Sequence, residues 1–355
     1  MAYTTIDDPS AHFQSAIWSG TGSALSVTFG GNSDMQPDMV WVKNRTVSSD
    51  HRLSDSVRGT SSHLVPNDSA AIDTSSTALT AFNSDGFSVG SEQSYSKSGS
   101  SHVGWGWKAG GSTSTNTAGS LDSTTSVNTT AGFSIVTWTG NGSAETIGHG
   151  LGSIPKTVIV KRLNAVEHWQ VYHANVGGTK YLQLSTNDAE ATASSRWANS
   201  TPTANVFYVG GHASTNADGS TYVAYCWAEK KGYSKFGIYT GNGAASDGPM
   251  TYLGFRPSYL IIKNNSHADD WRLLDDKRSS TGPSNPIDKH LYAHTSGTEA
   301  ASSTNSVPDG VDFLSNGFKI RQATNGLNGS GRTYIYMAWA ASPFVNSNGI
   351  PTTAF

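Results

Sequence analysis

Short runs of β-branched and aromatic residues recur along the chain and predict β-strands. Val158–Lys161 and Leu260–Lys263 are each preceded by a proline, which a strand accepts at its first residue but not at its centre. Tyr222–Trp227 and Tyr334–Trp339 are apolar at both alternating sets of positions, as in a strand that is covered on two faces. No long stretch places apolar residues at helical spacing, so no long helix is predicted.

Turn signals separate these runs. Asp85-Gly86, Asp218-Gly219 and Asn328-Gly329 supply the residues that tolerate a positive φ, which tight hairpin turns require. Many short strands with a turn signal every 8 to 12 residues or so are typical of an all-β sandwich. The sequence therefore predicts an all-β fold.

Two sequence blocks recur three times at matched offsets. The first block is Trp18–Gly22, Trp138–Gly142 and Tyr239–Gly243, and the second is Pro37–Lys43, Pro155–Lys161 and Pro257–Lys263. Seven positions after the lysine of each second block stand Asp50, His168 and Asp270. The period is about a hundred residues, far above the 20 to 50 or so of a solenoid repeat, so each copy is long enough to be a small domain. We predict three tandem homologous β-sandwich domains.

Composition shifts indicate where these domains end. Repeat 1 spans residues 1–108 with a short N-terminal lead-in, repeat 2 spans 132–231, and repeat 3 spans 232–355 with an extended C-terminal tail. Residues 109–131 are rich in Gly, Ser and Thr and are predicted to be a linker. Such a segment is flexible if nothing packs on it.

The chain is poor in charge. Net charge is −3, and charged residues make up 14%, against about 25% in an ordinary globular protein. No basic stripe is present, which argues against nucleic-acid binding. The single cysteine, Cys226, lies in an aromatic strand pattern and is expected to be a buried apolar filler, so no disulfide framework is expected.

No targeting or membrane segment is evident. Met1–Asp8 lacks the charged and apolar regions of a signal peptide, and no run approaches the 18 or so apolar residues of a membrane span. The sequence thus predicts synthesis in a cytoplasm and no membrane insertion. The Ser, Thr, Asn and Gly content is nevertheless typical of extracellular β-proteins. A virion component released by lysis reconciles these two features, and a plain cytosolic protein is the alternative.

One acidic cluster has the composition of a functional site. Repeats 1 and 3 place the same residue types at the same offsets: Asp50, Asp55 and Arg58, and Asp270, Asp275 and Arg278. The carboxylates could bind a metal or sugar hydroxyls, or the Asp–Arg pairs could hold neighbouring strands together. Repeat 2 has His168 and His173 instead and no matching arginine, and this drift favours the structural role. No metal and no cofactor are expected.

No catalytic arrangement stands out. A glycoside hydrolase needs two carboxylates about 5 to 9.5 Å apart across a cleft. Asp275 and Asp276 are adjacent and would point to opposite faces of a strand. Nucleophile elbows, zinc-binding helices and phosphate loops are absent from the sequence. The sequence therefore predicts that the protein is not an enzyme.

The chain is rich in aromatic residues, with 10 Trp, 14 Tyr and 12 Phe. Those that repeat in register are expected in the cores: Trp107, Trp227 and Trp339, with Phe87, Phe207 and Phe318. Those that do not repeat are the candidates for binding a ligand: Trp41, Tyr95, Tyr181 and Trp197. Burial is the other explanation for these four.

Several segments resemble a known family. Tyr3–Pro9, Met35–Arg45, Trp105–Gly111, Tyr222–Phe236 and Pro351–Phe355 are similar to a family of virion proteins from marine and cyanobacterial tailed bacteriophages. The resemblance covers essentially the whole chain. It implies a tail-fibre-like or other virion structural protein, built from lectin-type sandwiches of the jelly-roll, concanavalin or SPRY kind. It implies no catalytic residues.

These observations lead to one main expectation. The chain is expected to lie on the virion, at the tail or the capsid surface, as a tail-fibre or knob-like adhesin that binds host-surface glycans. Its expected partners are other virion proteins and a host glycan or receptor, in a homo-oligomer for which a trimer is plausible. A capsid decoration or cement protein is the second hypothesis, and a glycan depolymerase is the third.

Overall fold

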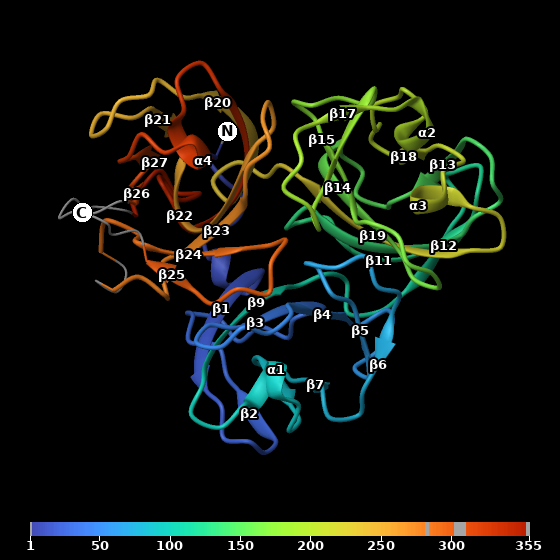
Figure 1. Ribbon diagram of the computed structural model, residues 1–355, viewed down its shortest axis with the longest axis horizontal. Coiled ribbons are helices and arrows are strands. Elements are labelled where there is room, and N and C mark those ends of the chain that lie inside the picture. The colour runs from blue at the N-terminus through green and yellow to red at the C-terminus, as the bar shows by residue number, and fades with distance from the viewer. Residues whose placement is uncertain (1, 281–283, 302–309, 353–355) are drawn as a thin grey trace.

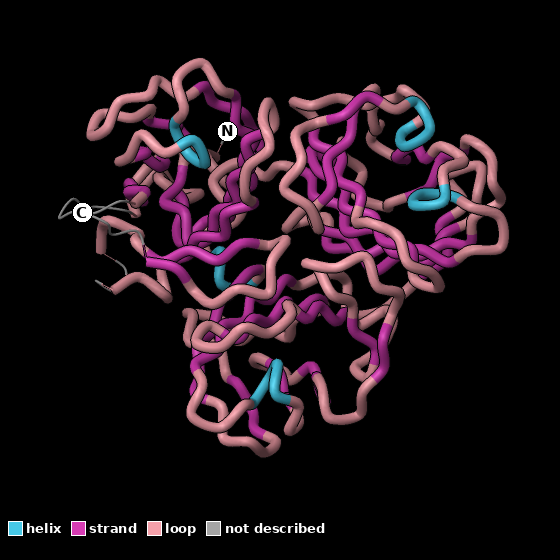
Figure 2. Tube along the Cα trace, viewed as in Figure 1, coloured by secondary structure: helices cyan, strands magenta, loops and turns pink. Residues whose placement is uncertain are grey.

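The computed structural model describes residues 2–280, 284–301 and 310–352, and this part of the chain is nearly all β. Strands make up 42% and helices 6%, which confirms the predicted all-β class. The helices of the described residues are single turns, drawn in cyan in Figure 2: η1 (Pro9–Ala11), α1 (Gln93–Ser96), α2 (Ser194–Trp197), α3 (Ala213–Asn216) and α4 (Asn325–Asn328).

Repeat 1 contains one larger and two small sheets. The larger sheet has the order β1 (Phe13–Ser19), β9 (Ser101–Trp107), β3 (Met39–Asn44), β4 (Arg52–Asp55). A three-stranded sheet has the order β2 (Leu25–Val27), β8 (Phe87–Val89), β7 (Leu79–Phe82). The third is the pair β5 (Ser62–His63) and β6 (Asp73–Thr74).

Repeats 2 and 3 reproduce this strand order. In repeat 2 the larger sheet has the order β10 (Ser114–Asn116), β11 (Ser123–Asn128), β12 (Phe133–Thr139), β19 (Thr221–Ala228), β14 (Pro155–Arg162), β15 (Gln170–His173), β16 (Lys180–Gln183), β17 (Ala191–Thr192). The small sheet of repeat 2 is the pair β13 (Glu145–Gly148) and β18 (Val206–Val209). In repeat 3 the larger sheet is β20 (Ser234–Thr240), β28 (Thr333–Pro343), β22 (Phe255–Asn264), β23 (Trp271–Asp275), β24 (Lys289–Tyr292), β25 (Ala300–Ala301), and the small sheet is β21 (Met250–Tyr252), β27 (Gly317–Ile320), β26 (Val311–Leu314).

In each repeat the last long strand lies between the first strand and the strand that carries the repeated lysine. All of these pairings are antiparallel. Pro155 is the first residue of β14, as the sequence predicts. Pro257 is instead the third residue of β22, where it stands at a register shift. A bulge accepts proline because one residue there is left out of the hydrogen-bond ladder.

Each larger sheet buries one face against the small sheet of its own repeat. The resulting outer cores contain Phe87 and Val42 in repeat 1, Phe207 in repeat 2, and Phe318 and Ile262 in repeat 3. Each repeat is thus a two-layered, sandwich-like body. Figure 1 shows the three bodies as three lobes, blue to blue-green for repeat 1, green to yellow for repeat 2 and orange to red for repeat 3.

The opposite faces of the three larger sheets meet in one central core. Trp107, Trp227 and Trp339, which occupy equivalent positions, lie in mutual edge-to-face contact there, with ring centroids 6.3, 5.9 and 5.4 Å apart. Aromatic rings prefer this arrangement because the positive edge of one ring meets the negative face of the next. A void of about 10 Å³ beside these rings is no larger than one water requires. The central core is therefore closely packed.

Two terminal or connecting segments pack on the chain instead of extending from it. Residues 109–131, predicted as a linker, contain β10 and β11, and β11 pairs with β12 from Thr124↔Thr137 to Asn128↔Phe133. In the C-terminal tail, Phe344 N donates to Gly254 O (3.2 Å), and Ser347 N donates to Asp7 Oδ1 (2.6 Å). The last three residues of the predicted tail, 353–355, lie outside the described residues.

The central core predicts that the three repeats unfold together. Replacing Trp107 with alanine should lower the free energy of unfolding by about 3–5 kcal/mol, the usual cost of removing a buried large aromatic side chain. Hydrogen exchange should then speed up in β19 and β28 as well as in β9, because the deleted ring contacts Trp227 and Trp339.

The control is Tyr252→Ala, at a side chain that is 50% exposed, which should change the free energy of unfolding by less than about 0.5 kcal/mol. Unchanged protection in β19 and β28 of the Trp107→Ala protein would show that the lobes unfold independently.

Candidate ligand-binding site

Three equivalent loops, which we call the straps, join the repeats into a ring. They are residues 65–72 of repeat 1, 183–190 of repeat 2 and 292–299 of repeat 3, and each lies on the next repeat. Ser69 O accepts from Glu167 N (2.9 Å), Asn187 O from Asp269 N (2.8 Å), and Ser296 O from Ser49 N (2.9 Å). Repeat 1 thus contacts repeat 2, repeat 2 contacts repeat 3, and repeat 3 contacts repeat 1.

The aromatic residue that follows Asp50, His168 and Asp270 in the sequence also bonds a strap. Trp169 Nε1 donates to Val65 O and Trp271 Nε1 donates to Gln183 O, both at 2.9 Å. In repeat 1 the equivalent residue is His51, whose Nε2 lies 3.1 Å from Tyr292 O. The imidazole replaces the indole while keeping the same kind of contact.

The repeated lysines serve the same junctions. Lys43, Lys161 and Lys263 are fully buried, and each Nζ donates to a strap carbonyl: Ser296 O at 3.2 Å, Ser69 O at 3.1 Å and Asn187 O at 3.2 Å. Each Nζ also donates to a carbonyl of its own repeat. Burial lowers the pKa of each of the three ammonium groups to about 8, because it penalises the charged form.

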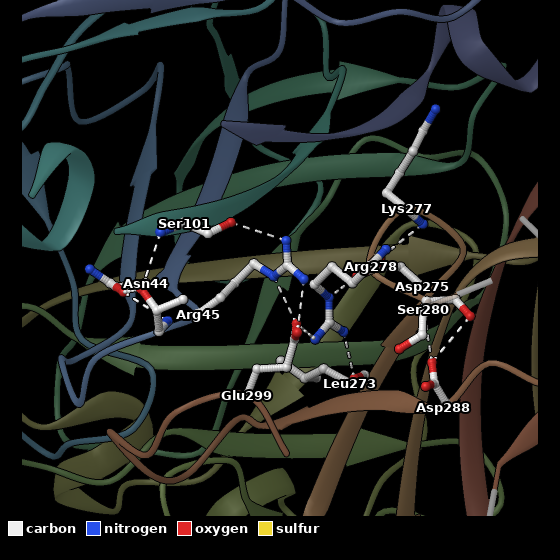
Figure 3. A network of polar contacts seen from close by, with 12 residues as sticks. Asn44, Arg45, Ser101, Leu273, Asp275, Lys277, Arg278, Ser280, Asp288 and Glu299 are labelled. Carbon is white, nitrogen blue, oxygen red and sulfur yellow. Dashed lines mark hydrogen bonds and ion pairs between the residues drawn. The ribbon is translucent and has the colours of Figure 1, made fainter. Parts of the chain in front are cut away.

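The Asp–Arg cluster of repeat 3 forms a buried ion-pair network with repeat 1 (Figure 3). Arg278 Nε donates to Asp275 Oδ2 at 2.6 Å, and Trp105 Nε1 of repeat 1 donates to the same oxygen at 2.9 Å. Arg278 Nη1 donates to Glu299 at 3.1 Å, and Glu299 also accepts two 2.8 Å bonds from Arg45 of repeat 1. Both Asp275 and Arg278 have fully buried side chains.

Repeat 1 has the same pair but not the same network. Arg58 Nε donates to Asp55 Oδ2 at 2.6 Å, and Tyr225 of repeat 2 donates its hydroxyl to that oxygen at 2.6 Å. Burial acts to lower the pKa of Arg58, but the charges and hydrogen bonds of Asp55 and Tyr225 together outweigh it and raise this pKa above the usual value. Arg58 Nη1, however, is buried without a hydrogen-bond partner.

The other members of the predicted cluster lie apart from these pairs. Asp50 accepts from Asn67 Nδ2 at 2.8 Å, and Asp270 lies 3.2 Å from His294 Nε2. In repeat 2, His173 takes the place of Asp55, and its Nε2 lies 3.3 Å from the backbone oxygen of Tyr336 in repeat 3. Asp50 and Asp270 are thus not part of these Asp–Arg ion pairs. The pairs themselves, Asp55–Arg58 and Asp275–Arg278, bond to neighbouring repeats.

Three of the four aromatic residues predicted to bind a ligand are buried. Trp41, Tyr95 and Trp197 are 3%, 1% and 2% exposed, and they pack in the central core, the repeat 1 core and the repeat 2 core respectively. Tyr181 is half-buried, with Arg196 Cζ 4.7 Å from its ring centroid. Burial of Trp41, Tyr95 and Trp197 corrects the expectation that these three have a surface role, whereas the prediction for Tyr181 stays a prediction.

An open groove of about 450 Å³ lies at the junction of repeats 1 and 2. Val57 and Arg58 of repeat 1 and Leu163 of repeat 2 line it, together with Asp122 and a set of threonines. These threonines are Thr115, Thr124, Thr137, Thr139 and Thr221. The groove is thus lined by hydroxyl groups, one carboxylate and one guanidinium, and also by the apolar or aromatic residues Val57, Leu163, Trp138 and Tyr222.

The threonines share one face of four neighbouring strands. Thr115 pairs with Thr124, Thr124 pairs with Thr137, and Thr139 pairs with Thr221. Residues that pair directly across strands lie on the same face of a sheet, so the five hydroxyls form a continuous row. Within the described part of the chain, none of these five hydroxyls bonds to another protein group. They are available to a ligand.

A smaller cavity of about 160 Å³ lies at the junction of repeats 3 and 1, lined among others by Gln14, Asp8 and Asp276. Burial, together with the neighbouring Asp275, raises the pKa of Asp276 to about 7. Residues 2–108, the described part of repeat 1, contain no strands equivalent to β10 and β11, and they form no threonine row at this junction.

Metal and membrane sites were also sought. The described residues contain no group of three or more His, Cys, Asp or Glu side chains placed to hold a metal ion. Among the same residues, no helix has the length and apolarity that a membrane crossing requires.

The fold and the junctions define an all-β protein in which three equivalent repeats close around one core, with a groove where two of them meet. The chain belongs to the family described as a domain of unknown function (DUF7483), whose model matches residues 8–343. Comparison with curated proteins and with solved structures found no match.

Sequence reasoning missed the groove because its floor comes from the predicted linker. One signal was present: Ser123–Asn128 contains the β-branched residues Thr124, Thr125 and Val127, which favour a strand. The Gly, Ser and Thr composition of the surrounding residues concealed it.

The buried ion pair of repeat 3 gives a first stability prediction. Asp275→Asn should lower the free energy of unfolding by about 3–5 kcal/mol, because it leaves the Arg278 charge buried without its main partner. Asp270→Asn is the control: its side chain is 31% exposed, and the expected loss is below about 1 kcal/mol. Denaturant unfolding of both variants checks this, and equal losses would contradict it.

The buried lysines give a prediction about pH. Their pKa is about 8 in the folded chain and about 10.5 in the unfolded chain, so between these values the unfolded chain holds more protons. The free energy of unfolding should therefore rise with pH in this window, by at most about 1.4 kcal/mol per pH unit for each lysine.

The measurement is denaturant unfolding from pH 7.5 to 9.5 of the natural chain and of Lys161→Met. The variant should show a smaller rise, and the titrations of Cys226 and the tyrosines cancel in the difference. Parallel curves for the two proteins would show that Lys161 does not titrate in this range.

Proposed function

We propose that this chain is a bacteriophage virion-surface protein, a tail-fibre or knob-like adhesin that binds host-surface glycans. In this proposal its three repeats are lectin-type sandwiches of the jelly-roll kind. The resemblance of the segments from Tyr3–Pro9 to Pro351–Phe355 to virion proteins supports the location.

The groove between repeats 1 and 2 is the observation that carries the binding role. Its row of five unbonded threonine hydroxyls can donate to and accept from sugar hydroxyls, and Asp122 can accept from them. Its open shape suits a chain-like ligand that extends beyond the site. Weak binding at one groove becomes strong attachment when several copies stand on one particle.

A second candidate, a capsid decoration protein that packs on other virion subunits, is favoured by a different observation. In repeat 2, β11 covers β12, but the equivalent strands β1 and β20 are the edges of their sheets. Ile17 and Ile238, at the position of Thr137, are 47% and 40% exposed on these edges. Proteins normally protect such edges, because an unpaired apolar strand can pair with another chain.

The expected location can be tested by immunogold labelling of phage particles with serum against this chain. Gold on the tail or its appendages is expected. Gold spread over the capsid would replace the adhesin with the decoration protein, and unlabelled particles whose denatured proteins also fail to react with the serum would contradict both.

The binding role can be tested with the purified chain on an array of bacterial surface glycans. The variant Thr139→Val with Thr221→Val should reduce binding at least about tenfold, since each lost hydrogen bond is worth about 1 kcal/mol. Thr240→Val, at the exposed equivalent of Thr139 in repeat 3, is the matched control and should bind normally. Equal binding by all three proteins would exclude the groove.

A further inference from the structure

Arg58 and Arg278 occupy equivalent positions but differ in their hydrogen bonds, since only Arg58 Nη2 also donates to a tyrosine hydroxyl, that of Tyr225 (3.1 Å). Each donates its Nε to an aspartate at 2.6 Å, and each Nη2 donates to the backbone oxygen of an equivalent leucine. Arg278 Nη1 donates to Glu299, whereas Arg58 Nη1 has no partner. One junction therefore satisfies this guanidinium fully and the other does not.

The residues that correspond to Glu299 and its second partner explain the difference. Glu299 N donates to Arg45 O at 2.8 Å, and Ile72 N donates to Leu163 O at 2.8 Å, so the two strap positions are equivalent. The ion pair Arg45–Glu299 of one junction is replaced by the apolar pair Leu163–Ile72 of the other. Repeat 1 therefore has an arginine, Arg58, equivalent to Arg278, but its strap has no carboxylate equivalent to Glu299.

Arg58, whose Nη1 has no hydrogen-bond partner, is part of the threonine-lined groove. Arg58 is one of the residues that line the groove, although its side chain is only 5% exposed. A buried cationic N–H without an acceptor is costly, and charge-assisted bonds to a carboxylate are about twice as strong as neutral ones. Guanidinium groups also match the geometry of a carboxylate.

We propose that Arg58 Nη1 is the carboxylate-binding point of the groove, so that its ligand is an acidic saccharide of the uronic-acid type. The ligand carboxylate accepts from Arg58 Nη1 as Glu299 does from Arg278 Nη1, which requires the Ile72 side chain at the equivalent position to move aside. The sugar hydroxyls lie along the threonine row and toward Asp122, which accepts from them. A saccharide fits better than an acidic peptide because the rest of the lining offers hydroxyl groups in a row. This inference rests on the proposed glycan-binding function.

The test compares oligosaccharides of a uronic acid with the same oligosaccharides after chemical reduction of the carboxyl groups. The full natural chain should bind the acidic form at least about tenfold more tightly by calorimetry, which is the worth of one charge-assisted hydrogen bond. An oligoglutamate peptide of similar charge is the third probe and should bind more weakly than the saccharide.

The decisive variant is Ile72→Glu combined with Leu163→Arg. It introduces into this junction an ion pair equivalent to Arg45–Glu299. The new carboxylate gives Arg58 Nη1 a protein partner, and the net charge is unchanged. The preference for the acidic form should fall to less than about threefold, while binding of the reduced form remains. Arg58→Gln should also lower the preference for the acidic form, but it removes the buried ion-pair partner of Asp55 as well. The double variant therefore keeps the test valid if Arg58→Gln does not fold.

The outcomes separate the two proposals. Equal binding of acidic and reduced saccharides by the natural chain overturns the role of Arg58 but leaves glycan binding intact. A folded double variant that keeps the full preference overturns it as well, and so does tighter binding of oligoglutamate. Binding of neither saccharide in this groove, together with no binding on the glycan array, overturns the glycan-binding function itself.

Discussion

The structure depends on the contact among three tryptophans. Trp107, Trp227 and Trp339 meet edge to face where the inner faces of the three larger sheets converge. A tryptophan buries about 150–250 Å², which at about 25 cal/mol per Å² corresponds to about 4–6 kcal/mol each. The contact exists only if all three repeats are present and correctly oriented. Packing at this point therefore makes one body of the three repeats.

The polar junctions follow from this arrangement. When the inner faces meet, the strap of each repeat lies on its neighbour, and its carbonyls become buried. Each buried carbonyl needs a donor, and the equivalent lysines Lys43, Lys161 and Lys263 supply it. The same constraint explains why aspartate, arginine and indole groups recur at fixed offsets. They satisfy one another across the junctions, as Asp275 does with Trp105.

Divergence between the repeats creates the site. A perfectly symmetric ring would have three identical junctions with every donor satisfied. Here the added strands β10 and β11 extend the larger sheet of repeat 2 beside the junction of repeats 1 and 2. At the same junction, Ile72 stands where repeat 3 has Glu299, so Arg58 Nη1 has no acceptor. Both departures from symmetry lie in the groove between repeats 1 and 2. A functional site commonly breaks a local rule that the rest of the structure obeys.

The sequence alone determined the strand-rich class, the triple repeat and the core positions of Trp107, Trp227 and Trp339, because periodicity and turn chemistry are local properties of the chain. It also favoured a structural role for Asp275 and Arg278. Only the tertiary structure decided that the repeats share a core, that residues 109–131 form strands, and which aromatic residues are buried. These features depend on contacts between residues far apart in the sequence, and no local pattern records which faces will meet.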